Sequence, residues 1–232
     1  MFIYKGHAIQ THDLLHINPE CLLDEAASQS DRIPGWAEES LRAVPFAVVR
    51  RDLISATWLP IGVRGPERNQ RWAASCSPRA ILHVMAPCQL LGRIVLSSRV
   101  ESVPALQCLE ILQARWKDLD FPWGPGGSVG FELATGMTAA NPGSDLDIVI
   151  RATQPIMIQR AKLLCEQTTD LPATVDIRVE TPVCGFSLKE YVRGSRHAIL
   201  LHTPNGPVLG SDPWHNGPHI LDVADNLERA DF

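Results

Sequence analysis

The sequence predicts an α+β protein of two small domains, the second containing a mixed sheet flanked by helices. Its 232 residues exceed the roughly 150 that one domain typically contains. A hydrophobic content of 45% is enough to bury a sizeable core, and strand-like and helix-like segments alternate in the second half. Because Ser77-Pro78 is typical of a linker, we expect an N-terminal α+β domain at 1–78, a second domain at 79–214 and a polar tail at 215–232.

Bulk properties exclude several classes of protein. The net charge of −5 argues against nucleic-acid binding that depends on overall positive charge. No apolar run approaches the roughly 20 residues that span a bilayer, and residues 1–10 lack the apolar segment of a signal peptide. The six cysteines form no Cys-x-x-Cys pair, as is typical of reduced thiols in a cytosolic protein. We therefore expect a cytoplasmic location.

In the first domain, the apolar runs 45–49 and 57–63 predict strands, and 36–43 predicts a short helix within the polar stretch 20–43. Residues 64–72 contain Arg64, Arg68 and Arg71, and fit a solvated loop followed by the start of a helix. The guanidinium fork of arginine also matches phosphate oxygens, so these three arginines are candidate contacts to substrate or to a partner protein.

His12 and His16 are four residues apart with an acid after the first, a spacing that resembles the zinc-binding helix of metalloproteases. The acid is Asp13 rather than glutamate, and Pro19 would end such a helix quickly. A turn or short helix near Thr11 is therefore favoured over a zinc site.

In the second domain, 107–119 carries apolar residues at helical spacing, and Pro104 suits the start of that helix. A helix is also expected from Pro155 to about 168, and Ser187 with Glu190 predicts a capping box before a third. The expected strands are 146–150, 174–180, 198–201 and 208–209, and 80–85 fits either a strand or a helix.

The strand that begins at Ser144-Asp145-Leu146-Asp147 carries the strongest chemical signal. Alternate residues of a strand point to opposite faces, so Asp145 and Asp147 point the same way while Leu146 points into a core. Two neighbouring carboxylates repel and raise one pKa unless a cation lies between them. Mg²⁺ or Mn²⁺ suits such oxygen ligands and leaves coordination positions for phosphate.

Upstream, Gly127-Ser128 offers backbone N–H groups and a hydroxyl to phosphate oxygens. Gly-Ser followed by Asp-x-Asp on a strand resembles the nucleotidyltransferase superfamily, whose fold is polymerase-β-like. The superfamily's third carboxylate matches Asp176, with Glu180 on the same strand face as the alternative. The segment between Ser128 and Asp145 is longer than usual, and 129–143 is expected to be an extra hairpin or a flexible loop.

A more specific resemblance covers nearly the whole chain. Residues 122–132 with 144–147 resemble the phosphoribosyl-dephospho-CoA transferase of malonate decarboxylase operons, also called malonate decarboxylase holo-acyl-carrier-protein synthase. The same family is matched by other segments, at 12–14, 59–65, 175–177, 180–182 and 212–214.

The resemblance implies a metal-dependent nucleotidyltransferase that attaches a prosthetic group. Its substrate would be 2′-(5″-triphosphoribosyl)-3′-dephospho-CoA, and its acceptor a serine of the apo acyl-carrier subunit of malonate decarboxylase. Asp145 and Asp147 would bind the metal, with Asp176 as the third catalytic carboxylate. Gly127, Ser128 and Ser144 would bind phosphate. The N-terminal domain would bind substrate or carrier.

Two other functions stay open. One is a nucleotidyltransferase that uses an ordinary nucleoside triphosphate. The other is a non-catalytic module that binds a carrier protein, although an intact cluster of carboxylates argues against it because such a cluster is costly without a cation.

Overall fold

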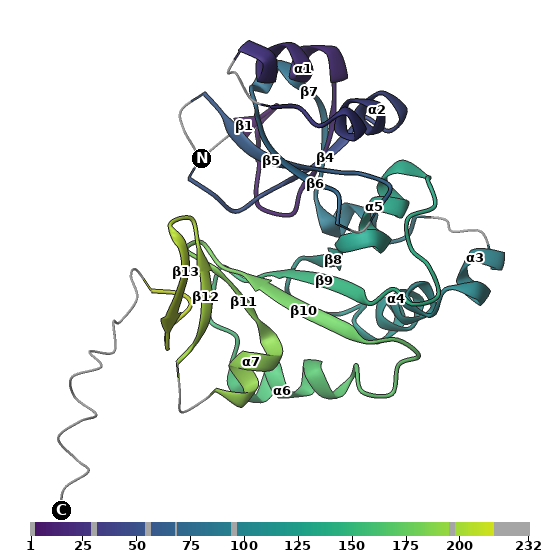
Figure 1. Cartoon of the computed structure of the whole chain (residues 1–232). Coiled ribbons are helices and arrows are strands. Elements are labelled where there is room, and N and C mark those ends of the chain that lie inside the picture. Colours follow the sequence, from purple (N-terminus) through teal and green to yellow (C-terminus); the bar gives the residue numbers. More distant parts are fainter. Residues whose placement is uncertain are drawn as a thin grey trace, which may run out of the picture.

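The computed structural model describes residues 3–28, 32–53, 57–67, 69–93, 97–194 and 198–215. Figure 1 shows two sheets, one built from the first part of the chain and one from the second, with helices packed around both. This arrangement confirms the predicted α+β class. None of the helices in the described ranges is long and apolar enough to cross a membrane.

The first sheet has five antiparallel strands in the order β6-β5-β4-β3-β7. The strands are β3 (Leu14–Ile17), β4 (Phe46–Val49), β5 (Leu59–Arg64), β6 (Arg71–Cys76) and β7 (Ile81–Met85). Helices α1 (Pro19–Ser28) and α2 (Gly35–Ala43) bury Leu22 and Leu41 in the same core as Leu15 and Ile61. A hairpin of β1 (Ile3–Tyr4) and β2 (His7–Ala8) precedes the sheet, and the short 3-10 helix η1 (Pro78–Ala80) leads into β7.

The predicted strands at 45–49 and 57–63 and the helix at 36–43 are confirmed. One expectation was wrong: the segment expected to begin a helix near residue 72 is strand β6, which pairs with β5 along its whole length. The polar stretch after residue 19 also contains helix α1, which had not been predicted. Residues 80–85 form mainly a strand, β7, which pairs with β3, so the first sheet extends beyond the expected boundary at residue 78.

The second sheet has six strands in the order β13-β12-β11-β10-β9-β8. They are β8 (Trp123–Pro125), β9 (Leu146–Arg151), β10 (Val175–Glu180), β11 (Gly185–Ser187), β12 (Ile199–Thr203) and β13 (Gly206–Gly210). Only β9 and β10 run parallel, and a parallel pair requires a crossover connection. Helix α6 (Ile158–Glu166) makes that crossover, so the sheet is mixed as predicted.

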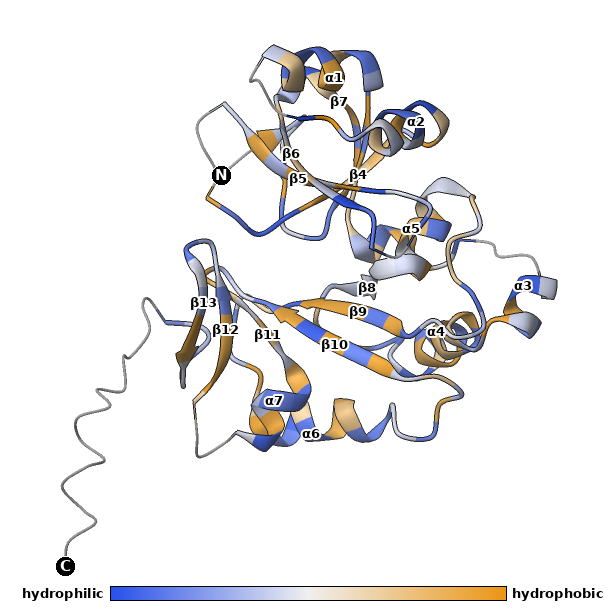
Figure 2. Ribbon diagram, in the orientation of Figure 1, coloured by the Kyte–Doolittle hydropathy of each residue, from blue (hydrophilic) through white to orange (hydrophobic). Residues whose placement is uncertain are grey.

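Helices α4 (Pro104–Arg115), α6 and α7 (Leu188–Arg193) bury apolar side chains against one face of this sheet, and α3 (Ser97–Ser102) precedes α4. Figure 2 shows hydrophobic residues concentrated along β9, whereas β10 alternates between hydrophobic and hydrophilic. Ile148 and Ile177 point into the core. Near the end of the described chain, Trp214 donates to the Ala152 carbonyl and closes the fold.

The segment expected to be a hairpin or flexible loop is instead helix α5 (Gly127–Thr135), followed by a turn-rich connection to β9. Gly136 ends the helix in the left-handed conformation, with a φ of 73°. The Glu132 carboxylate accepts bonds from Arg99 and from the backbone amides of Ala139 and Ala140. This side chain therefore holds the connection against the helix.

The two sheets are not separate bodies. Leu14 and Met85 of the first sheet are buried in the core of the second, and Phe46 makes an edge-on contact with Phe131 of α5 at 6.5 Å between ring centroids. Where the chain passes between the sheets, Gly124 lies so close to Pro87 that an added Cβ would stand 2.0 Å from the Pro87 carbonyl oxygen. Helix α5 lies between the two sheets (Figure 1).

Candidate functional site

Strands β9 and β10 bring two of the predicted carboxylates side by side. Asp147 and Asp176 are register partners in the parallel pair, so their backbones are about 4.8 Å apart and their side chains leave the same face. Asp145 lies just before β9. Burial, followed by the negative charges of Asp176 and Asp145, raises the pKa of Asp147, and Arg178 and His12 oppose this effect. The three predicted carboxylates therefore share one electrostatic environment.

Gly127 places the start of α5 directly against Asp147. Its φ is +54°, and an added Cβ would lie 1.8 Å from Asp147 Oδ2. The neighbouring Gly126 N–H donates to the Asp147 backbone oxygen at 2.8 Å. The N-terminus of a helix presents unpaired N–H groups and a partial positive charge, so the predicted phosphate-binding pair Gly127-Ser128 lies beside the carboxylates.

Ser144 has a more local role in the structure. Its hydroxyl oxygen accepts a hydrogen bond from the Asn141 N–H at 3.0 Å, and its own N–H donates to the Asn141 carbonyl at 2.9 Å. These two bonds close the turn that delivers Asp145 to the start of β9.

The carboxylates fit a hard divalent cation that also binds phosphate. In the part of the chain that the structure describes, no three histidine, cysteine, aspartate or glutamate side chains are grouped as a metal site. Mg²⁺ is usually held by one or two carboxylates together with substrate phosphates rather than by a full protein cage. Asp145 and Asp147 match that pattern beside the N-terminus of α5.

Arg178 is a cation that the sequence analysis did not select. It follows Asp176 by two residues on β10, on the same strand face and beside Val149 of β9, and its charge lowers the pKa of Asp147. The alternation along β10 is the signal that points to it. Arg178 adds positive charge beside Asp147.

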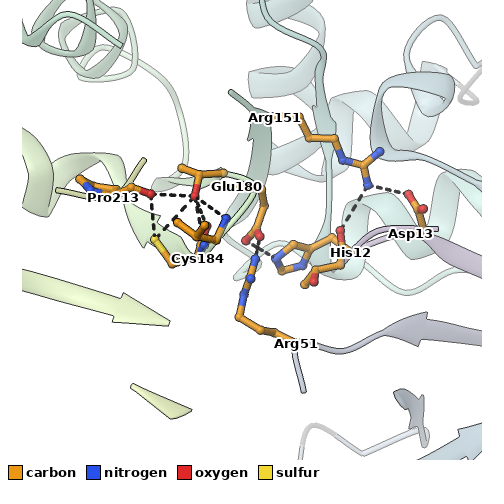
Figure 3. Close-up of polar contacts among 10 residues, drawn as sticks. His12, Asp13, Arg51, Arg151, Glu180, Cys184 and Pro213 are labelled. Carbon is orange, nitrogen blue, oxygen red and sulfur yellow. Dashed lines mark hydrogen bonds and ion pairs between the residues drawn. The ribbon is translucent and has the colours of Figure 1, made fainter. Parts of the chain in front are cut away.

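Further along β10, Glu180 pairs with groups from the first sheet rather than joining the carboxylates (Figure 3). It is 8% exposed, accepts a hydrogen bond from His12 Nε2 at 3.0 Å and forms an ion pair with Arg51. Four residues of strand separate it from Asp176, roughly 13 Å at the usual rise. Of the two candidates, Asp176 is therefore the one beside Asp147.

His12 lies in the turn before β3, with a φ of 70°. Burial, then the charges of Arg178, Arg51 and Arg151, lower its pKa to about 4, although Asp147 opposes them. The imidazole is therefore neutral at pH 7. Because the Glu180 carboxylate is an acceptor, Nε2 carries the proton and Nδ1 is left as the acceptor nitrogen.

A second ion pair joins the two sheets nearby. Arg151 Nη2 donates to Asp13 Oδ1 at 2.6 Å and to the Thr11 carbonyl at 3.2 Å (Figure 3). Asp13 is 2% exposed, and burial raises its pKa although Arg151 opposes this. The turn at 10–13 therefore docks on the same polar face of β9 and β10 as the carboxylates, beside them along the strands.

The structure describes two of the three arginines that were proposed from the sequence. Arg64 and Arg71 are register partners at one end of the β5–β6 hairpin, and Arg71 is exposed. Arg68 lies outside the described residues. Among the described residues, the cations that the pKa shifts of Asp147 and His12 reflect include Arg51, Arg151 and Arg178. Long separation in the sequence hid the contributions of Arg51 and Arg151.

Comparison with known proteins matches both halves of the chain. The family model described as phosphoribosyl-dephospho-CoA transferase MdcG C-terminal domain matches residues 93–213, and the corresponding N-terminal domain matches 10–87. The chain belongs to the MdcG family. The resemblance predicted from residues 122–132 and 144–147 is thereby confirmed.

Members of the MdcG family align over nearly their full length. A phosphoribosyl-dephospho-CoA transferase of Klebsiella pneumoniae subsp. pneumoniae is 38% identical over 210 residues, covering 88% of this chain and 95% of the relative. Proteins of the same name from Pseudomonas syringae pv. tomato and Pseudomonas putida are 35% and 36% identical, covering 92% and 90% of this chain and 97% and 96% of the relatives. No solved structure matches the chain significantly.

Proposed function

We propose that this chain transfers the phosphoribosyl-dephospho-CoA group from 2′-(5″-triphosphoribosyl)-3′-dephospho-CoA to a serine of the apo acyl-carrier subunit of malonate decarboxylase. Relatives that align over most of the chain carry the name of this transferase. The observation that carries the proposal is the register pair of Asp147 and Asp176 next to the start of α5, because carboxylates suited to a cation and to a proton then lie beside N–H groups suited to phosphate.

The reaction forms one bond and breaks one. The serine Oγ attacks the α-phosphorus of the triphosphate, the bond to the β-phosphate oxygen breaks, and pyrophosphate leaves. The serine proton passes to a base, for which we propose Asp176. The product is a phosphodiester between the carrier serine and the phosphoribosyl group.

Residues of this chain bind and orient the reactants. The N–H groups and the hydroxyl of Gly127-Ser128 hold the β- and γ-phosphates, and Arg178 adds positive charge beside Asp147. Asp145 and Asp147 would hold Mg²⁺ or Mn²⁺, which would supply positive charge to the phosphates and acidity to the serine hydroxyl. Neutral His12 does not repel that cation.

The test is the intact mass of the apo carrier subunit after incubation with this protein, Mg²⁺ and triphosphoribosyl-dephospho-CoA. We expect a mass gain that matches the phosphoribosyl-dephospho-CoA group and disappears with EDTA. Asp147→Asn should lower the rate by roughly 10³-fold or more while leaving the protein folded, since charge stabilisation is among the largest catalytic effects. The matched control is Asp118→Asn, at a side chain that is 87% exposed, and it should transfer normally.

The outcomes separate the alternatives. No mass gain from folded protein and verified substrate would remove this function and favour a search among ordinary nucleoside triphosphates. Carrier binding that ignores Mg²⁺, with no turnover, would indicate a binding module. Substantial activity in Asp147→Asn would contradict the assignment of the carboxylates.

A further inference from the structure

A cavity of about 650 Å³ opens at Asp176, on the side of β10 away from β9. It is lined by residues of α6, the loop from α6 to β10, the first half of β10, and α7. Its volume lies within the roughly 300–1,000 Å³ typical of small-molecule sites. The cavity therefore begins at a residue of the reaction centre and extends away from it.

The cavity exists because strand β11 is short. β11 pairs only with Arg178–Glu180 of β10, and the chain then turns into α7 at Leu188. Val175–Ile177 consequently has no neighbouring strand on that side among the described residues. The open strand edge offers backbone N–H and C=O groups to whatever occupies the cavity.

The lining combines apolar walls with two amines. Leu171 and Val192 supply apolar surface, and the Lys162 and Lys189 side chains are exposed at the cavity. Lys189 lies near enough to the Cys165 thiol for its charge to lower the pKa of that thiol, although burial raises it more strongly. Glu166 also lines the cavity and can accept a hydrogen bond from an amine or hydroxyl. This chemistry suits a ligand that is long, partly apolar and anionic.

We propose that this cavity binds the dephospho-CoA portion of the donor substrate, with the diphosphate at Lys162 and Lys189. The inference rests on the proposed function, because that reaction fixes the α-phosphorus beside the carboxylates. The rest of the donor, an adenosine diphosphate joined to a pantetheine arm, must then leave the reaction centre in some direction. Asp176 is shared by the centre and the cavity. The amides of pantetheine match the open edge of β10.

The test uses dephospho-CoA itself, which lacks the triphosphoribosyl arm. This binding test therefore does not depend on the transfer reaction. We expect bound dephospho-CoA to protect Cys165 from alkylation by maleimide, as measured by peptide mass spectrometry. We also expect calorimetry to detect the binding of dephospho-CoA. Lys189→Glu and Lys162→Glu should each weaken binding about tenfold or more. Lys117→Glu, at a side chain that is 74% exposed on another part of the surface, should bind normally.

Transfer kinetics provide the second readout. Lys189→Glu should raise KM for the donor about tenfold and leave kcat within about twofold, with KM for the carrier unchanged. Unprotected Cys165 in the presence of bound dephospho-CoA, or a KM change confined to the carrier, would overturn the proposal. If wild-type protein fails to transfer, the calorimetric and alkylation results still decide whether dephospho-CoA occupies the cavity.

Discussion

At the scale of single residues, the contact between Gly127 and Asp147 sets the geometry of the candidate site. The left-handed φ of Gly127 and the 1.8 Å that would separate an added Cβ from Asp147 Oδ2 are independent reasons why only glycine fits. Gly136 has a similar φ but nothing within 4 Å of an added Cβ. A comparison of Gly127 with Gly136 therefore separates backbone strain from displacement of the carboxylate.

We expect Gly127→Ala to lower transfer by about 100-fold or more, because a shift of about 1 Å in a positioning group costs that much. Gly136→Ala should keep transfer, although a left-handed alanine lowers the free energy of unfolding of both variants by roughly 1 kcal/mol or more. Steady-state transfer rates and urea unfolding of both variants make the comparison. Equal loss of transfer in the two variants would show that strain, and not the carboxylate, is responsible.

The residues of the site were predictable where they lie on one local pattern. Asp145, Asp147 and Asp176 could be recognised because strand alternation places each on a polar face. Which strands are neighbours was not predictable from alternation, yet that pairing makes Asp147 and Asp176 adjacent. The contact of His12 with Glu180 spans 168 positions of the chain, and no local pattern indicates a partner at that distance.

At the scale of elements, helix α5 is the clearest case in which packing overrides composition. Its nine residues include two glycines and begin with one, and glycine lowers helix propensity, so the sequence suggested a loop. Burial of Val129 and Leu133 between the sheets supplies the stabilisation that helix propensity does not. Strands and helices with strong periodicity, such as β9, β10 and α4, were predicted correctly, whereas the short β8 and β11 were missed.

Glu132 is expected to stabilise both α5 and the connection to Asp145. Burial opposes its ionisation, but bonds from Arg99 and from two backbone amides outweigh burial and lower its pKa. Glu132→Gln would turn an amide N–H₂ toward one of these donors, so we expect a loss of roughly 2–4 kcal/mol in the free energy of unfolding. Glu110→Gln, exposed on α4, is the control. Urea denaturation measures both, and a loss below 1 kcal/mol would contradict the assigned role.

At the scale of the whole molecule, buried polar contacts and a shared core join the two sheets. Leu14 and Met85 belong to the core of the second sheet, and His12, Arg51 and Asp13 contribute side chains to the polar face of β9 and β10. We expect the two halves to unfold together, because neither keeps its buried groups satisfied without the other.

The pH dependence of stability should report on His12. The pKa of His12 is about 4 in the folded protein against an ordinary value of 6.5, so the unfolded chain takes up the proton first as pH falls. The contribution of neutral His12 to the free energy of unfolding is complete above pH 6.5 and is lost as pH falls through about 4. His12→Gln should therefore flatten the decline in urea midpoint between pH 7 and pH 4 relative to wild type. The charged groups around His12 are the same in both proteins; they are Arg51, Arg151, Arg178, Asp147 and Glu180. An identical slope in the two proteins would refute the lowered pKa of His12.

The close approach of Gly124 to the Pro87 carbonyl has a consequence for the kinetics of substrate capture. A backbone contact this tight, together with the Arg151–Asp13 pair, holds the two halves together among the described residues. We expect the proposed donor to bind without a swing of the two halves, and its association rate to be set by diffusional encounter with a site that carries Arg51, Arg151 and Arg178. Such a rate falls as ionic strength rises and changes little with solvent viscosity beyond the diffusive effect.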